Sequence, residues 1–164
     1  MSIFKDDVRR FVEVTAPNKV NRTARQIALA LFRKVIMRTP VGNPSVWKSK
    51  RGPKGYVGGR ARGNWQCNIG PESTAAATEM RDADGNNTVE KAMDVLSEWQ
   101  PMGTGQTGMG GAGRETPIWI GNALPYIQRL EYDHWSQQAR NGMVRISLSE
   151  IRVGGVALGE APTL

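Results

Sequence analysis

A stretch of basic residues is the chemically most distinctive part of this sequence. Between Val41 and Gly63 the chain has no acidic residue, and its cations are Lys48, Lys50, Arg51, Lys54, Arg60 and Arg62. Such a loop contacts phosphates by charge, while the nearby rings of Trp47 and Tyr56 are suited to stack or wedge against bases. Three interpretations stay open: contact with nucleic acid, docking in an acidic groove of a neighbouring subunit, and a solvated loop.

A cysteine and a histidine are the only residues that suggest nucleophilic catalysis. The chain contains one of each, Cys67 and His134. Catalysis requires the thiolate within hydrogen-bond reach of the imidazole. Cys67, however, alternates with polar residues as a buried strand residue does, which favours a place in the core. No internal disulfide is possible, and we predict no metal site and no catalytic residue.

The glycine-rich segment from 102 to 116 matches a nucleotide-binding pattern only formally. Residues 103–108 and 108–113 both fit G-x-G-x-x-G. The dinucleotide fingerprint needs a strand before it and a helix after it, whereas here the pattern predicts a helix before it and more glycine follows. No glycine run ends in Gly-Lys-Ser/Thr. We therefore predict no cofactor and expect that the protein is not an enzyme.

Composition limits the fold and the partners. The chain has 164 residues, an apolar fraction of 39% and a net charge of +7. This length fits one domain with a modest core, and the charge favours an anionic neighbour, either nucleic acid or an acidic protein surface. The start lacks the apolar stretch of a signal peptide, and no window resembles a membrane span. We expect a soluble intracellular product with no membrane partner.

Helical spacing of apolar residues predicts several helices. The first covers residues 3–14, and a longer one follows Asn18 as its cap and ends at Thr39, with an apolar face wide enough for burial on two sides. A third begins at a capping box formed by Asn87 and Glu90 and ends before Pro101. A short fourth helix is expected over 124–132.

Alternating residues predict two strands, at residues 65–69 and 117–121. The core is the favoured place for Trp119 and Ile120, with an exposed interface as the alternative. Residues 71–86 are turn-like, residues 143–151 favour a helix over a strand, and residues 154–164 form an extended arm. The expected fold class is α+β, in which a small, mainly antiparallel sheet packs on three to four helices in a single domain over 1–153, with the long glycine-rich and basic loops projecting.

Several short segments resemble those of one family. They are residues 38–42 (RTPVG), 59–65 (GRARGNW), 120–127 (IGNALPYI), 130–132 (LEY), 136–139 (SQQA) and 142–145 (GMVR). In this order they resemble the tail-completion proteins of long-tailed bacteriophages, a family that includes minor tail protein Z of lambda-like phages and head-tail joining proteins. The basic residues between Val41 and Gly59 look like an insertion relative to that family, and Asp133 replaces its usual glycine.

The resemblance implies a structural virion protein, made in the host cytoplasm and placed at the neck or tail top. It implies a hexameric ring with genomic double-stranded DNA in the lumen, contacting the tail terminator and tail tube on one side and head-closure or connector proteins on the other. The six cations would face the DNA or a neighbouring ring. Residues expected at the subunit interface are Trp47, Tyr56, Met109, Trp119, Tyr126, Tyr132 and Trp135.

Three alternatives remain open. A tail terminator or a head-closure ring subunit shares the same ring architecture. A free-standing, sequence-independent nucleic-acid-binding protein would bind duplex DNA as a monomer, with an affinity that falls as salt rises. A Cys/His hydrolase would lose its reaction, and not its assembly, when Cys67 is replaced by alanine.

Overall fold

The computed structural model describes residues 10, 16–46, 54–70, 74–99, 117–153 and 156–157. The predicted helix over 3–14, apart from Arg10, lies outside these residues. So do the predicted glycine-rich loop over 102–116 and all but two residues of the predicted arm over 154–164.

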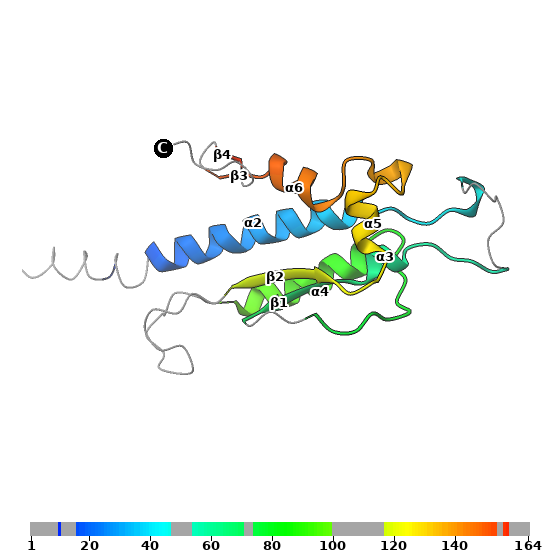
Figure 1. The fold of residues 1–164 in the computed structure, drawn as a ribbon. Helices are drawn as coiled ribbons and strands as arrows, with labels where there is room; N and C mark the ends of the chain where they lie inside the picture. The colour runs from blue at the N-terminus through cyan, green and yellow to red at the C-terminus, as the bar shows by residue number, and fades with distance from the viewer. Residues whose placement is uncertain are drawn as a thin grey trace, which may run out of the picture.

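A long helix, α2 (Ala16–Arg38), is the central element of the fold (Figure 1). It packs against α4 (Asn86–Glu98) on one side and against α6 (Val144–Glu150) on the other. The side chains of Phe32 and Ile36 are almost completely buried. The predicted burial of this helix on two sides is therefore confirmed, although Asn18, the predicted cap, lies inside the first turn.

A two-stranded antiparallel sheet lies beside α4 (Figure 1). Strand β1 (Trp65–Ile69) pairs with β2 (Ile118–Asn122), so that Trp65 faces Asn122 and Ile69 faces Ile118. Both strands were predicted to within one residue. A sheet of two strands needs a packing partner, which α4 supplies. Helices and this small antiparallel sheet confirm the predicted α+β class.

The start of α4 differs from the prediction. The carboxylate of Asp82, and not a capping box, accepts hydrogen bonds from the backbone N–H groups of Gly85 (3.0 Å) and Thr88 (2.8 Å) and from the Thr88 hydroxyl (2.7 Å). Asn87 and Glu90 lie exposed within the helix. Burial tends to raise the pKa of Asp82, but the hydrogen bonds from Thr88 outweigh it and the pKa is lowered. The capping-box prediction is wrong because the cap comes from a residue four positions before the helix starts.

The C-terminal part of the described chain is mainly helical. It contains α5 (Ile127–Tyr132), a 3-10 turn η3 (Gln137–Ala139) and α6, which confirms the helix favoured over residues 143–151. Strands β3 (Arg152–Val153) and β4 (Val156–Ala157) then form a small antiparallel pair. The two described residues of the predicted arm, Val156 and Ala157, therefore lie in a paired strand.

Ion pairs attach α6 to α2. Glu150 at the end of α6 binds Lys34 at 2.7 Å and Arg38 at 2.5 Å. Arg38 also donates to the Ser147 hydroxyl at 3.1 Å. The hydrogen bonds from Arg38 and Lys34 lower the pKa of Glu150 to about 2. Lys34 and Arg38, in the last turns of α2, thus hold a neighbouring helix besides complementing the helix dipole.

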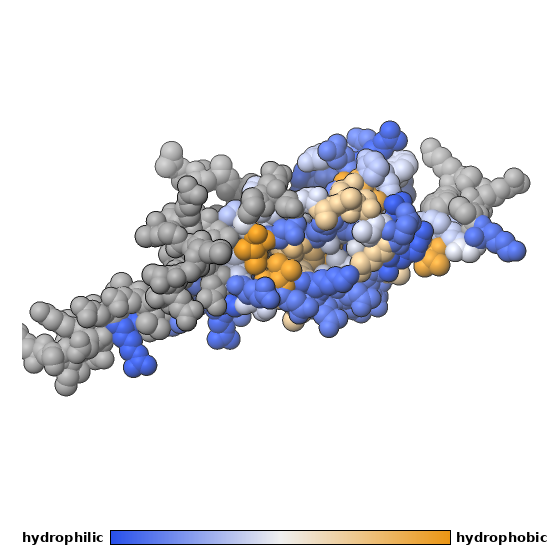
Figure 2. Space-filling model, turned by 90° about the horizontal axis from the view of Figure 1, so that it is seen from below, coloured by the Kyte–Doolittle hydropathy of each residue, from blue (hydrophilic) through white to orange (hydrophobic). Residues whose placement is uncertain are grey.

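Seen from below, the described surface is mainly hydrophilic, with small hydrophobic patches between polar areas (Figure 2). Large hydrophobic side chains that are exposed include Met93, Tyr132 and Trp135, each at least half exposed. Among the described helices, none has the length and hydrophobicity needed to cross a bilayer.

Candidate subunit interface

The segments that carry the family resemblance meet at the C-terminal end of α2. Thr39 follows α2, and its hydroxyl donates to the Val35 carbonyl at 2.7 Å. The same hydroxyl accepts a 2.7 Å hydrogen bond from the indole N–H of Trp65 at the start of β1. Thr39 and Trp65 are both buried. The T-P-V segment and the tryptophan of the next segment therefore join α2 to the sheet.

A second pair of segments meets around Glu131. The buried carboxylate accepts hydrogen bonds from the backbone N–H groups of Met143 (2.6 Å), Val144 (2.9 Å) and Arg145 (3.0 Å), and from the Arg145 guanidinium (3.2 Å). Burial tends to raise the pKa of Glu131, but these hydrogen bonds lower it overall. Gly142 has φ +82°, and a Cβ there would lie 2.6 Å from a Glu131 carboxylate oxygen. The L-E-Y segment thus caps the helix that begins in the G-M-V-R segment.

Arg62 has a different role from the one expected. Its guanidinium donates to the backbone carbonyls of Met37 (3.1 Å), Thr39 (2.9 Å) and Ala83 (2.5 Å). These carbonyls include ones left unpaired at the end of α2. Burial lowers the pKa of Arg62 despite the opposing effect of Asp82. Because its donors are used inside the subunit, Arg62 is no longer a candidate for contact with DNA or with a neighbouring ring.

We expect Arg62→Met to lower the free energy of unfolding by about 1–3 kcal/mol, since several backbone carbonyls lose a charged donor. Urea unfolding of the variant measures this effect. Arg33→Met is the matched control, because Arg33 is exposed on α2 and should change stability by no more than about 0.5 kcal/mol. A variant that unfolds like the native chain and yet binds DNA less tightly would restore the phosphate role.

The other expected cations differ in their surroundings. The predicted loop over 41–63 contains a 3-10 turn, η2 (Pro44–Val46), and a short helix, α3 (Arg60–Gly63), so it is not irregular throughout. Arg60 pairs with Glu79 at 2.8 Å and donates to a backbone carbonyl. Lys54 is exposed. The other expected cations, Lys48, Lys50 and Arg51, lie outside the described residues, and so do the expected interface residues Trp47 and Met109.

Aromatic and arginine side chains gather around α5. The rings of Tyr126 and Trp135 lie 6.2 Å apart between centroids, and the Arg129 guanidinium lies 5.8 Å from the centre of the Trp135 ring. The Arg145 guanidinium lies 4.8 Å from the centre of the Tyr132 ring. Tyr132 and Trp135 are each 59% exposed. We call these five residues the arginine–aromatic surface.

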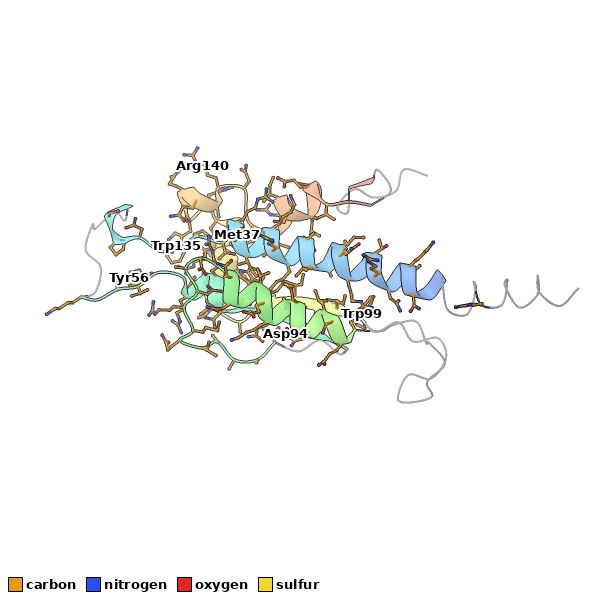
Figure 3. All side chains as sticks on the ribbon, turned by 180° about the vertical axis from the view of Figure 1, so that it is seen from behind. Met37, Tyr56, Asp94, Trp99, Trp135 and Arg140 are labelled. Carbon is orange, nitrogen blue, oxygen red and sulfur yellow. The ribbon has the colours of Figure 1, made fainter. Side chains whose placement is uncertain are left out.

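Tyr56 lies at the same end of the molecule, as Figure 3 shows for Tyr56 and Trp135. The Arg81 guanidinium is 5.7 Å from the centre of the Tyr56 ring. Burial raises the pKa of Tyr126, and the charges of Arg60 and Arg81 partly oppose this change. Tyr56, Arg60, Tyr126 and Trp135 are thus brought together by the fold.

Trp119 stands apart from this group. On β2 the side chains of Ile118 and Ile120 pack against the core, so Trp119 between them points to the opposite face. It is 37% exposed and donates to the Gly70 carbonyl at 2.6 Å. The predicted core location is therefore wrong for Trp119 and confirmed for Ile120. Among the expected interface residues that the structure describes, Trp119 is therefore not part of the group around α5.

Cys67 occupies the core, as predicted. It is buried between β1 and α4, and burial raises its pKa to about 11, so the thiol stays protonated at neutral pH. Exposed His134 contacts the Arg140 carbonyl instead. No hydrogen bond between described residues joins Cys67 to His134. Within the same part of the chain, no three acidic, cysteine or histidine side chains are grouped so that they would hold a metal ion.

Comparisons with protein-family models, with curated proteins and with solved structures found no match.

Three arginines of the candidate interface were not predicted from the sequence: Arg81, Arg129 and Arg145. Nothing in the local sequence indicates that Arg81 lies over Tyr56, since the two are joined only by the fold. For Arg129 a signal existed, because the chain from Tyr126 to Trp135 is dense in aromatic residues and contains a single arginine. Arg145 belongs to the G-M-V-R segment, but that motif does not indicate that its side chain lies over the Tyr132 ring.

Proposed function

We propose that this chain is a structural subunit of a ring at the neck or tail top of a long-tailed bacteriophage. The ring completes the tail and joins it to the head, and double-stranded DNA passes through its lumen. One observation carries the proposal: separate segments that resemble the family contact each other in pairs, across 26 residues in one pair and 12 in the other. Thr39 binds Trp65, and Glu131 caps the helix that starts after Met143. Contacts of this kind are expected if the segments belong to one conserved structural pattern, and they support the proposal.

The arginine–aromatic surface supports an assembly role. Tyrosine, tryptophan and arginine are the residue types that contribute most to protein interfaces. In this chain they are exposed together next to α5. An aromatic side chain with two rotatable bonds loses little conformational freedom on binding, so such a surface suits a permanent subunit contact.

The cations of the basic loop have a secondary role in this proposal. Lys54, together with Lys48, Lys50 and Arg51, faces the lumen or the adjoining ring. Contacts with phosphates alone give weak, salt-sensitive and sequence-independent attraction. Tight binding would obstruct DNA ejection, so the isolated subunit should bind duplex DNA only weakly. The ring is expected to be a hexamer that contacts the tail terminator and tube below and head-closure or connector proteins above.

Electron microscopy of particles produced without this protein tests the proposal. Separate filled heads and tails of normal length are the expected result, because the joining ring is missing. Overlong tails would instead identify a tail terminator, and heads that lose their DNA would identify a head-closure ring. Normal infectious particles would overturn the whole proposal.

A free-standing nucleic-acid-binding protein is the second candidate, favoured by the net charge of +7. It requires that the isolated monomer bind duplex DNA with an affinity that falls steeply as salt rises. A gel-shift titration from low to physiological salt measures this. Submicromolar binding by a monomer at physiological salt would favour this candidate over the ring.

A further inference from the structure

One face of α4 carries acidic side chains at four-residue spacing. Glu90, Asp94 and Glu98 are all exposed on this helix, and Asp94 is labelled in Figure 3. Residues four apart lie on the same side of a helix, so the three carboxylates form a row. Met93, half exposed, lies beside the middle of this row. We call these four residues the acidic face.

The acidic face is electrostatically unfavourable within a single subunit. Like charges four residues apart destabilise a helix. Acidic residues towards a helix C-terminus also oppose the helix dipole. The last turn of α4 contains no basic residue of its own, and the cation that reaches it is Arg25 of α2, which donates to the Ser97 carbonyl at 3.2 Å. Lys91, the nearest cation on the helix, directs its ammonium group to the sulfur of Met80 at 3.2 Å. No ion pair between described residues involves the three carboxylates.

A surface of opposite charge exists on the same chain. Arg129 and Arg145 belong to the arginine–aromatic surface. Exposed Arg140 follows η3: its carbonyl contacts His134, next to Trp135, and its guanidinium donates to the Gln137 side chain at 2.7 and 2.9 Å.

Three acidic residues lie in or beside this region: Glu131, Asp133 and exposed Glu79, whose charge acts on Tyr126 but which pairs with Arg60. Glu131 is buried and pairs with Arg145, while Asp133 is exposed. The exposed charge of the region is therefore positive.

We propose that the acidic face of one subunit docks on the arginine–aromatic surface of the next copy in the ring. This inference rests on the proposed function. The carboxylates of α4 would pair with Arg129 and Arg140, and Met93 would pack against the exposed Trp135 ring, a contact that thioethers and aromatic rings favour. Charge complementarity of this kind sets both the register and the specificity of an interface.

The positions of the two surfaces suit a head-to-tail contact. In Figure 3 Asp94 lies on the side formed by α4, whereas Trp135 and Arg140 lie at the end of the molecule where α2 terminates. One subunit therefore uses a different surface towards each of its two neighbours. Repetition of such a contact closes into a ring when the rotation between copies closes.

Charge reversal in the full chain tests the docking. The first variant is Glu90→Lys/Asp94→Lys, and the second is Arg129→Glu/Arg140→Glu. Each alone should raise the dissociation constant of the assembly about tenfold or more, because like charges then face each other. Analytical ultracentrifugation over a concentration series measures this constant, and circular dichroism verifies that each variant folds. Arg22→Glu/Arg33→Glu, at exposed positions of α2, is the matched control and should assemble like the native chain.

Mixing the two variants gives the decisive measurement. In the mixture every reversed acidic face meets a reversed arginine surface, and every native face meets a native one, so assembly should return with the two variants alternating. If both variants assemble like the native chain, or if each fails and their mixture stays monomeric, the docking is overturned. An annulus in virions that forms equally well with either variant would overturn the docking and leave the proposed function intact, whereas a native chain absent from virions would overturn the proposed function itself.

Discussion

Replacing Glu131 with alanine is expected to lower the free energy of unfolding by about 3–5 kcal/mol, as is typical when one partner of a buried charged network is removed. The carboxylate is buried and holds three backbone N–H groups at the start of α6 besides the Arg145 guanidinium. Alanine leaves those donors without an acceptor in the interior. Urea unfolding monitored by tryptophan fluorescence measures the change.

The pH dependence gives this prediction a second measurement. The folded state holds the pKa of Glu131 below its ordinary value of 4.5. A lowered carboxyl pKa stabilises the protein above the unfolded-state pKa, and this stabilisation is lost as the pH falls through the folded-state pKa. The stability difference between the native chain and Glu131→Ala should therefore be largest near neutral pH and should shrink as the pH falls below about 4.5.

Glu79→Ala is the matched control for Glu131→Ala. Glu79 also pairs with an arginine, but its side chain is 76% exposed. An exposed ion pair contributes about 0–1 kcal/mol, so this variant should unfold almost like the native chain. Equal losses in the two variants would mean that charge removal in general, and not the cap of α6, determines the effect.

Much of the fold could be predicted from hydrophobic periodicity. The wide apolar face of α2 and the alternation of Trp65, Cys67 and Ile69 are local patterns, and both elements were found where they were expected. The cap of α4 was missed because Asp82 acts through a turn at Gly85, which no helix-start pattern predicts. Hydrophobic periodicity thus locates helices and strands. The hydrogen bonds that cap their ends depend on the path of the chain between these elements.

The candidate site could be predicted by residue type but not by geometry. Tyr126, Tyr132 and Trp135 were expected at an interface, and the fold places them together around α5. Arg62 was grouped with the other cations of its loop, and yet it binds the end of α2. The sequence gives the charge of a side chain. Whether that side chain binds groups within its own subunit or contacts another molecule depends on which residues the fold places next to it.

Trp65 and Trp119 provide a matched pair for separating folding from assembly. Both tryptophans lie on the same sheet, and each indole N–H has an acceptor. Trp65→Ala should lower the free energy of unfolding by about 3–5 kcal/mol, because a large buried ring leaves a cavity. Trp119→Ala removes a side chain that is 37% exposed and should cost about 1 kcal/mol. Chemical unfolding of both variants measures these values.

The hydrogen bond between Trp65 and Thr39 can be isolated from the loss of the ring. Thr39→Val keeps the shape of the side chain but leaves the buried indole N–H unpaired, which should cost about 1–3 kcal/mol, whereas Thr39→Ser retains the hydroxyl and should cost less. In Trp65→Phe the donor is already absent, so Thr39→Val should then cost clearly less than in the native chain. Equal costs in the two backgrounds would show that the join between α2 and the sheet depends on packing alone.

Trp119→Ala should in turn weaken assembly more than folding if the exposed face of β2 contacts a neighbouring subunit.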